Sequence, residues 1–204
     1  MGSFVLVACQ TDVDIDTSDE DTNNKDSVFT SKAKRASMFD GSLDDVLDGS
    51  ACFEVQLPVD ILFNGAPLTV NTLADLDLFT ELDQVQIVFP ITVSNYDYTQ
   101  TTISGQQEFD VLANACNELI NSDKGPITCV DFIYPLTIFT SNNVQTQNDY
   151  TIDNDQELYV FIENLDPTEL YGFSYPLMLN SSQNGMLTIA NDSSLESAFD
   201  TCVN

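Results

Sequence analysis

Two stretches, Phe89-Pro-Ile-Thr-Val93 and Tyr134-Pro-Leu-Thr-Ile138, repeat one pattern: an aromatic residue, a proline, and then aliphatic and β-branched residues. Proline removes a hydrogen bond from a β-ladder, so it is usually confined to an edge strand, a strand start or a bulge. Its repetition indicates a duplicated unit. We interpret each proline as the mark of an outer strand that is kinked and kept from pairing outward.

Four copies of this unit follow residue 50. Each copy has a β-rich run with a proline, a turn rich in polar residues or glycine, and a second short strand ending in Thr-Val or Thr-Ile, which is typical of a hairpin. The four runs are Glu54–Leu62, Val85–Val93, Val130–Ile138 and Leu170–Leu179. Helix starts follow at Thr72, Gly105, Asn154 and Asn191, and three of them have an acid three residues later. These acids are predicted to cap helices and not to act in catalysis.

The unit is therefore a hairpin plus an amphipathic helix. Because one hairpin cannot bury its apolar face alone, we expect the units to pair. The predicted fold class is α+β: two tandem two-layer domains, each of two ββα units with a four-stranded, mainly antiparallel sheet and two helices. This layout resembles a β-grasp or ferredoxin-like sandwich. The Gly125-Pro126 breaker separates the domains, at residues 51–118 and 127–204.

The cysteines indicate how the units pair. Apart from Cys9, the chain has Cys52, Cys116, Cys129 and Cys202, which open and close the two pairs of units. Four cysteines allow three connectivities, and the repeat symmetry favours disulfides Cys52–Cys116 and Cys129–Cys202. The main rival is Cys116–Cys129, and free buried thiols are a further alternative. The sequence lacks the Cys-x-x-Cys spacing of zinc and thioredoxin-type sites.

The charge balance limits the partners. The 204 residues include 33 Asp and Glu against 5 Lys and Arg, a net charge of −28. Phosphate contacts need Lys and Arg, so nucleic acid is not an expected partner. A cation, a neutral glycan or a basic protein is favoured, or simple solubility in a salty medium. Because the chain has no His, Ser-His-Asp and Cys-His catalysis and His-bearing zinc sites are excluded.

The N-terminus indicates export. Leu6-Val-Ala-Cys9 ends a short apolar run and looks like the lipobox of a bacterial lipoprotein, with Cys9 lipidated. We predict residues 1–9 to be a signal-peptide remnant. The run is short and has no base, so either the signal is truncated or the match is due to chance. Residues 10–50 are predicted as an acidic flexible tether, within which Ser37–Asp48 forms a short helix or strand beside the first domain.

The tether also contains the metal candidates of the sequence. Asp12, Asp14 and Asp16 are spaced as in a calcium loop. The loop's Gly at the sixth position and Glu at the twelfth are missing, so a solvated tether is the favoured interpretation. We predict no cofactor, and calcium is the one candidate ion.

Several motifs support a family resemblance: Cys52–Pro58, Val88–Val93, Cys129–Pro135 and Asp155–Leu158. With them, the chain from Met38 to Cys202 resembles uncharacterised secreted or surface lipoproteins of marine Bacteroidota. The acidic run behind Cys9 resembles the surface-export signal of such lipoproteins. The resemblance implies an outer-membrane location, facing outward on a lipid anchor. It implies no functional residues.

The sequence favours a non-enzymatic cell-surface module that binds a glycan, a cation or a protein partner. Tyr96 and Tyr98 are candidates for stacking on a sugar, or else they mark an exposed strand end. One alternative is a carboxylate-only enzyme such as a glycoside hydrolase, which needs two suitably separated carboxylates. Among 33 acids such a pair has little specificity, and we assign no catalytic residue. Another alternative is a structural spacer of a longer surface protein.

Overall fold

The computed structural model of the chain describes residues 22–80, 84–141 and 147–202. Its helices and antiparallel sheets make the chain α+β. The first half of the molecule contains η2 (Ser42–Asp44), α2 (Asp45–Asp48), β2 (Phe53–Val55), β3 (Val59–Phe63), β4 (Ala66–Val70), α3 (Leu73–Leu76), β5 (Val85–Ile87), β6 (Ile91–Asn95), β7 (Gln100–Ile103) and α4 (Gln106–Asn121). The second half contains β1 (Asn23–Asn24), α1 (Val28–Ala36), β8 (Val130–Phe132), β9 (Leu136–Ser141), β10 (Gln147–Ile152), α5 (Asp155–Asn164), β11 (Leu170–Phe173), β12 (Leu177–Ser181), β13 (Gly185–Ile189) and α6 (Asp192–Cys202).

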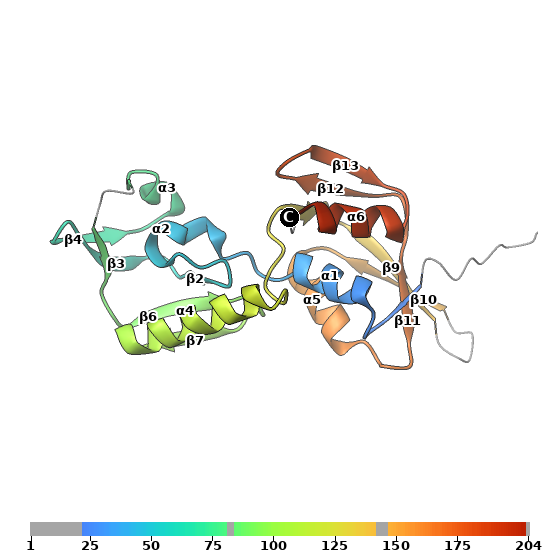
Figure 1. Cartoon of the computed structure of the whole chain (residues 1–204), viewed down its shortest axis with the longest axis horizontal. Coiled ribbons are helices and arrows are strands. Elements are labelled where there is room, and N and C mark those ends of the chain that lie inside the picture. Colours follow the sequence, from blue (N-terminus) through green and yellow to red (C-terminus); the bar gives the residue numbers. More distant parts are fainter. Residues whose placement is uncertain (1–21, 81–83, 142–146, 203–204) are drawn as a thin grey trace, which may run out of the picture.

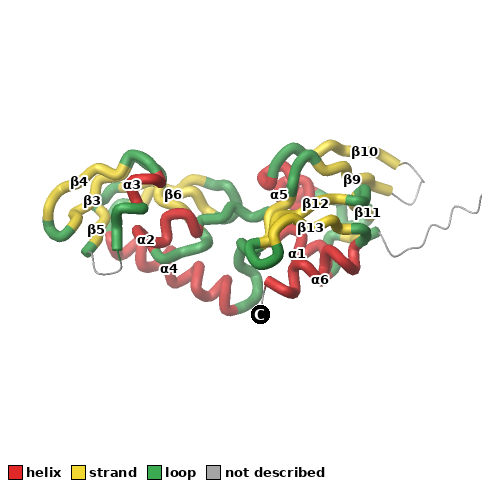
Figure 2. The backbone as a smooth tube through the Cα atoms, turned by 90° about the horizontal axis from the view of Figure 1, so that it is seen from above, coloured by secondary structure: helices red, strands yellow, loops and turns green. Residues whose placement is uncertain are grey.

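Figure 1 shows the two halves next to each other, and Figure 2 shows them from above. Each half has its own hydrophobic core. The largest fully buried side chain of the first core is Phe53, and those of the second include Tyr171, Phe173 and Phe199. Whether each half folds as an independent domain stays a prediction.

The four predicted hairpins are β3–β4, β6–β7, β9–β10 and β12–β13, and a helix follows each of them. The three predicted acids act as caps, and Ser194 makes the same contact in the fourth unit, where the acid is missing. The side chains of Asp75, Glu108, Glu157 and Ser194 each accept the N–H of the residue four positions earlier, at 2.6–3.2 Å. This bond satisfies a backbone donor at the helix start.

The sheets differ from the predicted four-stranded sheet in each domain. Each unit has an additional short strand before its proline, and that strand pairs with the neighbouring unit. In the first half this exchange gives two three-stranded sheets, β2-β6-β7 and β4-β3-β5. In the second half it gives β13-β12-β8 and β1-β11-β9-β10. The pairs Val55↔Val93 and Ile61↔Ile87 show the exchange in the first half.

The interpretation of the prolines as marks of outer strands is wrong. Pro58, Pro90, Pro135 and Pro176 each follow a cis peptide bond and lie between the exchanged strand and the hairpin of the same unit. At this point the chain leaves one sheet and enters the other. The repeated aromatic-proline pattern therefore marks a crossing between sheets.

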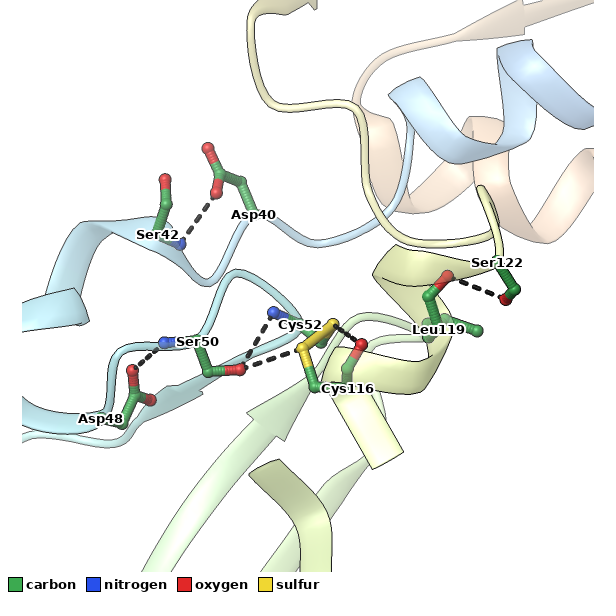
Figure 3. Close-up of a disulfide and its surroundings, with 8 residues drawn as sticks. All are labelled: Asp40, Ser42, Asp48, Ser50, Cys52, Cys116, Leu119 and Ser122. Carbon is green, nitrogen blue, oxygen red and sulfur yellow. Dashed lines mark hydrogen bonds between the residues drawn. A yellow bond between two sulfur atoms is a disulfide. The ribbon is translucent and has the colours of Figure 1, made fainter. Parts of the chain in front are cut away.

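Both disulfides favoured by the repeat symmetry are present in the structure. The first disulfide joins Cys52 to Cys116, and the second joins Cys129 to Cys202, each with a Cα–Cα distance of 5.7 Å. In each half the disulfide joins the start of the first unit to the last helix of the second unit. Figure 3 shows the first disulfide beside Ser50, whose hydroxyl contacts Cys116 Sγ at 3.1 Å.

The N-terminal segment departs most from expectation. Residues 22–36 were predicted to belong to a flexible tether, but they form β1 and α1 on the second half. Ser27 caps α1 by accepting the N–H of Thr30 at 3.0 Å. On the inner face of α1, Phe29, Ala33 and Ala36 are buried in the second core. Ser42–Asp48, within the predicted helix or strand Ser37–Asp48, forms η2 and α2.

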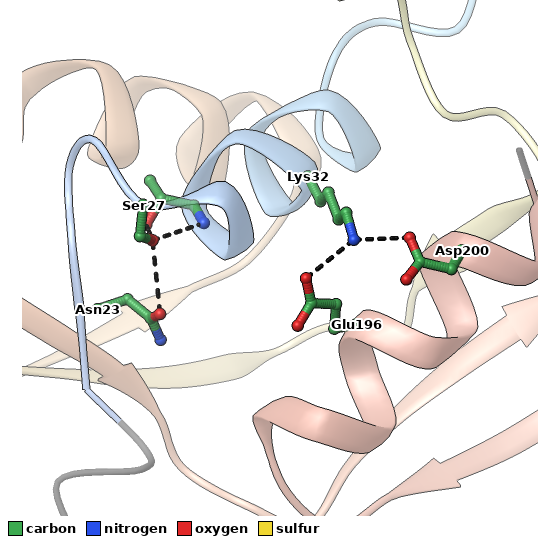
Figure 4. Close-up of polar contacts among 6 residues, drawn as sticks. Asn23, Ser27, Lys32, Glu196 and Asp200 are labelled. Carbon is green, nitrogen blue, oxygen red and sulfur yellow. Dashed lines mark hydrogen bonds and ion pairs between the residues drawn. The ribbon is translucent and has the colours of Figure 1, made fainter. Parts of the chain in front are cut away.

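The bases of this segment bind acids of the second half. Lys32 Nζ lies 2.9 Å from Glu196 and 2.6 Å from Asp200, both on α6 (Figure 4). Lys34 forms an ion pair with Glu163 on α5. These ion pairs of Lys32 and Lys34 therefore connect α1 to α6 and α5.

Candidate ligand-binding cavity

A cavity of about 390 Å³ lies where the two halves meet. The segment after α1 contributes Phe39 and Asp40, and the turn between β6 and β7 contributes Tyr98. From the second half come Asp131 on β8 and Asp155 at the start of α5. The cavity thus combines three carboxylates with two aromatic rings from four separate segments.

The charge on Asp40 acts on the other two carboxylates. Burial raises the pKa of Asp155, and the charges on Asp131 and Asp40 raise it further, whereas a hydrogen bond from Tyr134 opposes the shift. Burial and the charge on Asp40 likewise raise the pKa of Asp131. Asp40 Oδ1 accepts the N–H of Ser42 at 2.8 Å, which fixes its position in the wall. A positive charge in the cavity would relieve this mutual repulsion.

The aromatic wall connects the two halves. Tyr98, at φ 65°, donates its hydroxyl to the carbonyl of Ser37 at 2.8 Å. Its ring centroid lies 5.7 Å from that of Phe39, edge to face, and 5.8 Å from that of Tyr159 on α5. The ring of Tyr96, by contrast, packs against the first core. Of the two predicted sugar-stacking residues, the structure places only Tyr98 at the cavity.

Asp155 also has a role in the scaffold. Tyr134, which precedes a crossing proline, donates its hydroxyl to Asp155 Oδ1 at 2.6 Å. Tyr175 and Asp192 make the equivalent bond in the fourth unit, at 2.5 Å. The first half has Leu57 and Phe89 at the positions of these tyrosines. The pairing of Tyr with Asp is therefore shared by both units of the second half, whereas only Asp155 of the two acids lines the cavity.

Two larger grooves lie at the proline crossings. One of about 580 Å³ surrounds Pro58 and Pro90, and one of about 430 Å³ surrounds Pro135 and Pro176. Because they occur at matching positions in both halves, they follow from the strand exchange. A functional site usually departs from the pattern of its scaffold. The cavity between the halves is not repeated, so it is the better candidate.

The chemistry of the cavity suits a positively charged group. Carboxylates attract cations, and the faces of aromatic rings add cation–π attraction. Among the described residues, no three His, Cys, Asp or Glu side chains form a group that could hold a metal ion. The predicted candidates Asp12, Asp14 and Asp16, and the lipidation residue Cys9, lie outside the part of the chain that the structure describes.

Sequence reasoning did not identify Phe39, Asp131 or Asp155 as site residues. Asp155 was assigned to a helix start and Asp131 to a strand, and the resemblance motifs that contain them imply no functional role. The only available signal was that Phe39-Asp40 follows a run of bases and small residues that ends α1.

Comparison of the chain with protein-family models, with curated proteins and with solved structures found no match. In the described part of the chain, no helix has the length and apolar character needed to cross a membrane.

Proposed function

We propose that the protein is a non-enzymatic surface module that binds a basic side chain of a protein partner in the cavity between its halves. The observation that carries this proposal is the meeting of three carboxylates, Asp40, Asp131 and Asp155, with the rings of Phe39 and Tyr98. The chain's net charge of −28 would draw basic partners toward this face from a distance.

A guanidinium or ammonium group matches this environment in two respects. Its positive charge can attract several carboxylates at once, and a planar guanidinium can also donate bidentate hydrogen bonds to a carboxylate. Stacking on an aromatic face contributes about 0.5–2 kcal/mol, depending on how far the contact is desolvated. A neutral glycan would gain the aromatic contact but not the electrostatic one.

The wider setting is part of the same proposal. We propose that the protein is an exported lipoprotein, anchored through Cys9 at the outer membrane and facing outward. Its two halves would be tandem modules of paired ββα units, with a β-grasp or ferredoxin-like character. The lipobox-like start supports export, and the two disulfides are compatible with an oxidising compartment.

The test is a titration with arginine amide, followed by calorimetry near physiological salt. We expect saturable binding that Asp131→Asn weakens at least tenfold. Asp110→Asn is the matched control, because Asp110 is exposed on α4 and loses the same charge. Equal weakening by both variants would reduce the effect to overall charge and refute a defined site.

A second candidate, a carboxylate-only glycoside hydrolase, is favoured by one observation. Asp131 and Asp155 line one cavity, and the pKa of each is raised, as a general acid requires. Hydrolysis of a polysaccharide by the wild type, abolished by Asp155→Asn but retained by Asp110→Asn, would support this candidate over the binding module.

A further inference from the structure

A second group of acids lies beside the segment that forms the cavity wall. Asp44 is fully buried, and its Oδ2 accepts the N–H of Val55 at 2.8 Å. Asp48, four residues later, accepts the N–H of Ser50 through Oδ1 at 2.9 Å. The second oxygen of each carboxyl, Asp44 Oδ1 and Asp48 Oδ2, is buried and has no hydrogen-bond partner.

The surroundings of these two carboxyls contain acids but no base. η2 and α2 pack against β2, β5 and α3. The titratable groups of these elements are Asp45 on α2, Glu54 on β2 and Asp75 on α3, and β5 contributes none. Asp75 is half-buried, and its carboxylate already accepts the N–H groups of its own helix start. A buried carboxylate without a counter-charge is costly, so it binds a proton instead.

The direction of the pKa shifts agrees with this geometry. Burial raises the pKa of Asp44 to about 7. Burial and the charge on Asp44 raise the pKa of Asp48 to about 8. Near neutral pH the pair therefore holds protons that the unfolded chain would release.

We propose that Asp44 and Asp48 form a proton-holding latch that keeps Ser42–Asp48 on β2, and that its ionisation loosens the cavity wall formed by Phe39 and Asp40. The inference assigns a regulation to the proposed cavity and rests on that proposed function. As pH rises, we expect the affinity of the wild-type cavity for its ligand to fall in comparison with a variant whose latch cannot ionise.

The latch is connected to the wall by short contacts. Asp40 Oδ1 accepts the N–H of Ser42, the first residue of η2. The N–H of Gly41 donates to the carbonyl of Ala51 at 3.2 Å. On the other side, Ser50 contacts both the Asp48 carboxylate and the first disulfide, as Figure 3 shows. Movement of the latch would therefore be transmitted to Asp40, while the disulfide keeps the following strand in place.

The first experiment measures the latch without any ligand. We would record the melting temperature of the full chain between pH 6 and 9. Because the chain has no His, few other groups titrate in this range. A raised folded-state pKa gives stability that is lost as pH rises through it. We expect the wild-type melting temperature to fall, Asp44→Asn/Asp48→Asn to remove most of this fall, and Asp110→Asn, the exposed control on α4, to retain it.

Hydrogen exchange of the wild type keeps the test valid if the double variant does not fold. Protection of residues 42–55 should decrease more between pH 6 and 9 than protection of β9, once intrinsic exchange rates are removed. An equal decrease in both regions would overturn the latch. A gain in melting temperature with Ca²⁺ at pH 9 that the double variant abolishes would also overturn it, since the pair would then hold a metal ion and not protons.

The second experiment connects the latch to the cavity, again with arginine amide as the probe. Arginine amide itself loses the proton of its α-amino group in this pH range, so the wild type is compared with the double variant at each pH. We expect the ratio of wild-type affinity to double-variant affinity to fall at least threefold from pH 6 to pH 9. An unchanged ratio refutes the coupling. No binding at any pH refutes the proposed function, while the melting experiment still tests the latch.

Discussion

Replacing Phe29 on α1 with alanine is the most direct test of how the N-terminal segment contributes to the fold. Phe29 is 6% exposed, and its ring lies edge to face against Phe173, with the centroids 6.1 Å apart. Burying about 150 Å² of aromatic surface at about 25 cal/mol per Å² is worth about 4 kcal/mol. This value lies within the range of about 3–5 kcal/mol typical of buried Phe→Ala changes. We expect Phe29→Ala to lower the free energy of unfolding of the second half by about 4 kcal/mol.

Val28→Ala is the matched control, because Val28 is adjacent on the same helix and 67% exposed. We expect its effect to stay within about 0.5 kcal/mol. The chain has no Trp, so unfolding in denaturant would be followed by circular dichroism. Hydrogen exchange would then show which half of the molecule loses stability. Protection of β9 and β12 should fall, and protection of β3 and β6 should be retained.

Two results would refute this reasoning. A cost below about 1 kcal/mol for Phe29→Ala would mean that α1 does not complete the second core, despite its burial. Equal loss of protection in both halves would mean that the chain unfolds as one cooperative unit. The prediction of two domains would then be wrong, whereas the place of α1 in the core would be retained.

Three further predictions concern single contacts. Gly41→Ala should destabilise the first half by about 1–3 kcal/mol in a denaturant melt, because a Cβ there would lie 2.4 Å from a backbone oxygen; Gly105→Ala, with no atom within 4 Å, is the control that should be tolerated. Tyr134→Phe should lower stability at neutral pH by about 1.5–3 kcal/mol and raise the pKa of Asp155 further, measured by NMR titration, since it removes a donor to the carboxylate; an unchanged titration would contradict this. Replacing both cysteines of the first disulfide with serine opens a loop with a sequence separation of 64. In the chain-entropy model this should lower the free energy of unfolding by about 4 kcal/mol, and an unchanged free energy of unfolding would contradict the prediction.

The hairpins, the helix starts and the disulfide pairing could be predicted because their signals are local or symmetric. Asn154 and Glu157 form a capping motif that can be recognised within four residues, and both make the expected kind of contact. The strand exchange could not be predicted. The strand that contains Phe53 has the same alternation of apolar and polar residues whether it pairs within its own unit or with β6. Which of these pairings forms depends on tertiary packing and not on local pattern.

The helix α1 was missed although its signals were present. Ser27 precedes it as a cap, Phe29, Ala33 and Ala36 follow at spacings of four and three, and Arg35 lies in its last turn. These are the start, face and end signals of a short helix. The surrounding Asp, Ser, Thr and Asn outweighed them in the prediction of a tether. The cavity had no comparable signal, because its residues come together only when the two halves meet.

The crossings of the chain explain why the units occur in pairs. Every unit places its first strand in a sheet of its neighbour, so a single unit would leave that strand unpaired and its own hairpin without a third strand. Each disulfide joins the beginning of one unit to the last helix of the next and so closes the exchanged pair covalently. The second pair also requires β1 and α1, which precede the first pair in sequence. The chain therefore passes from the second half to the first and back, and residues Ser37 to Asp40 in the first passage lie beside the acidic cavity. The second passage lines the same cavity through Ile127 and Thr128, so a ligand held there would contact both halves and both of their covalent connections.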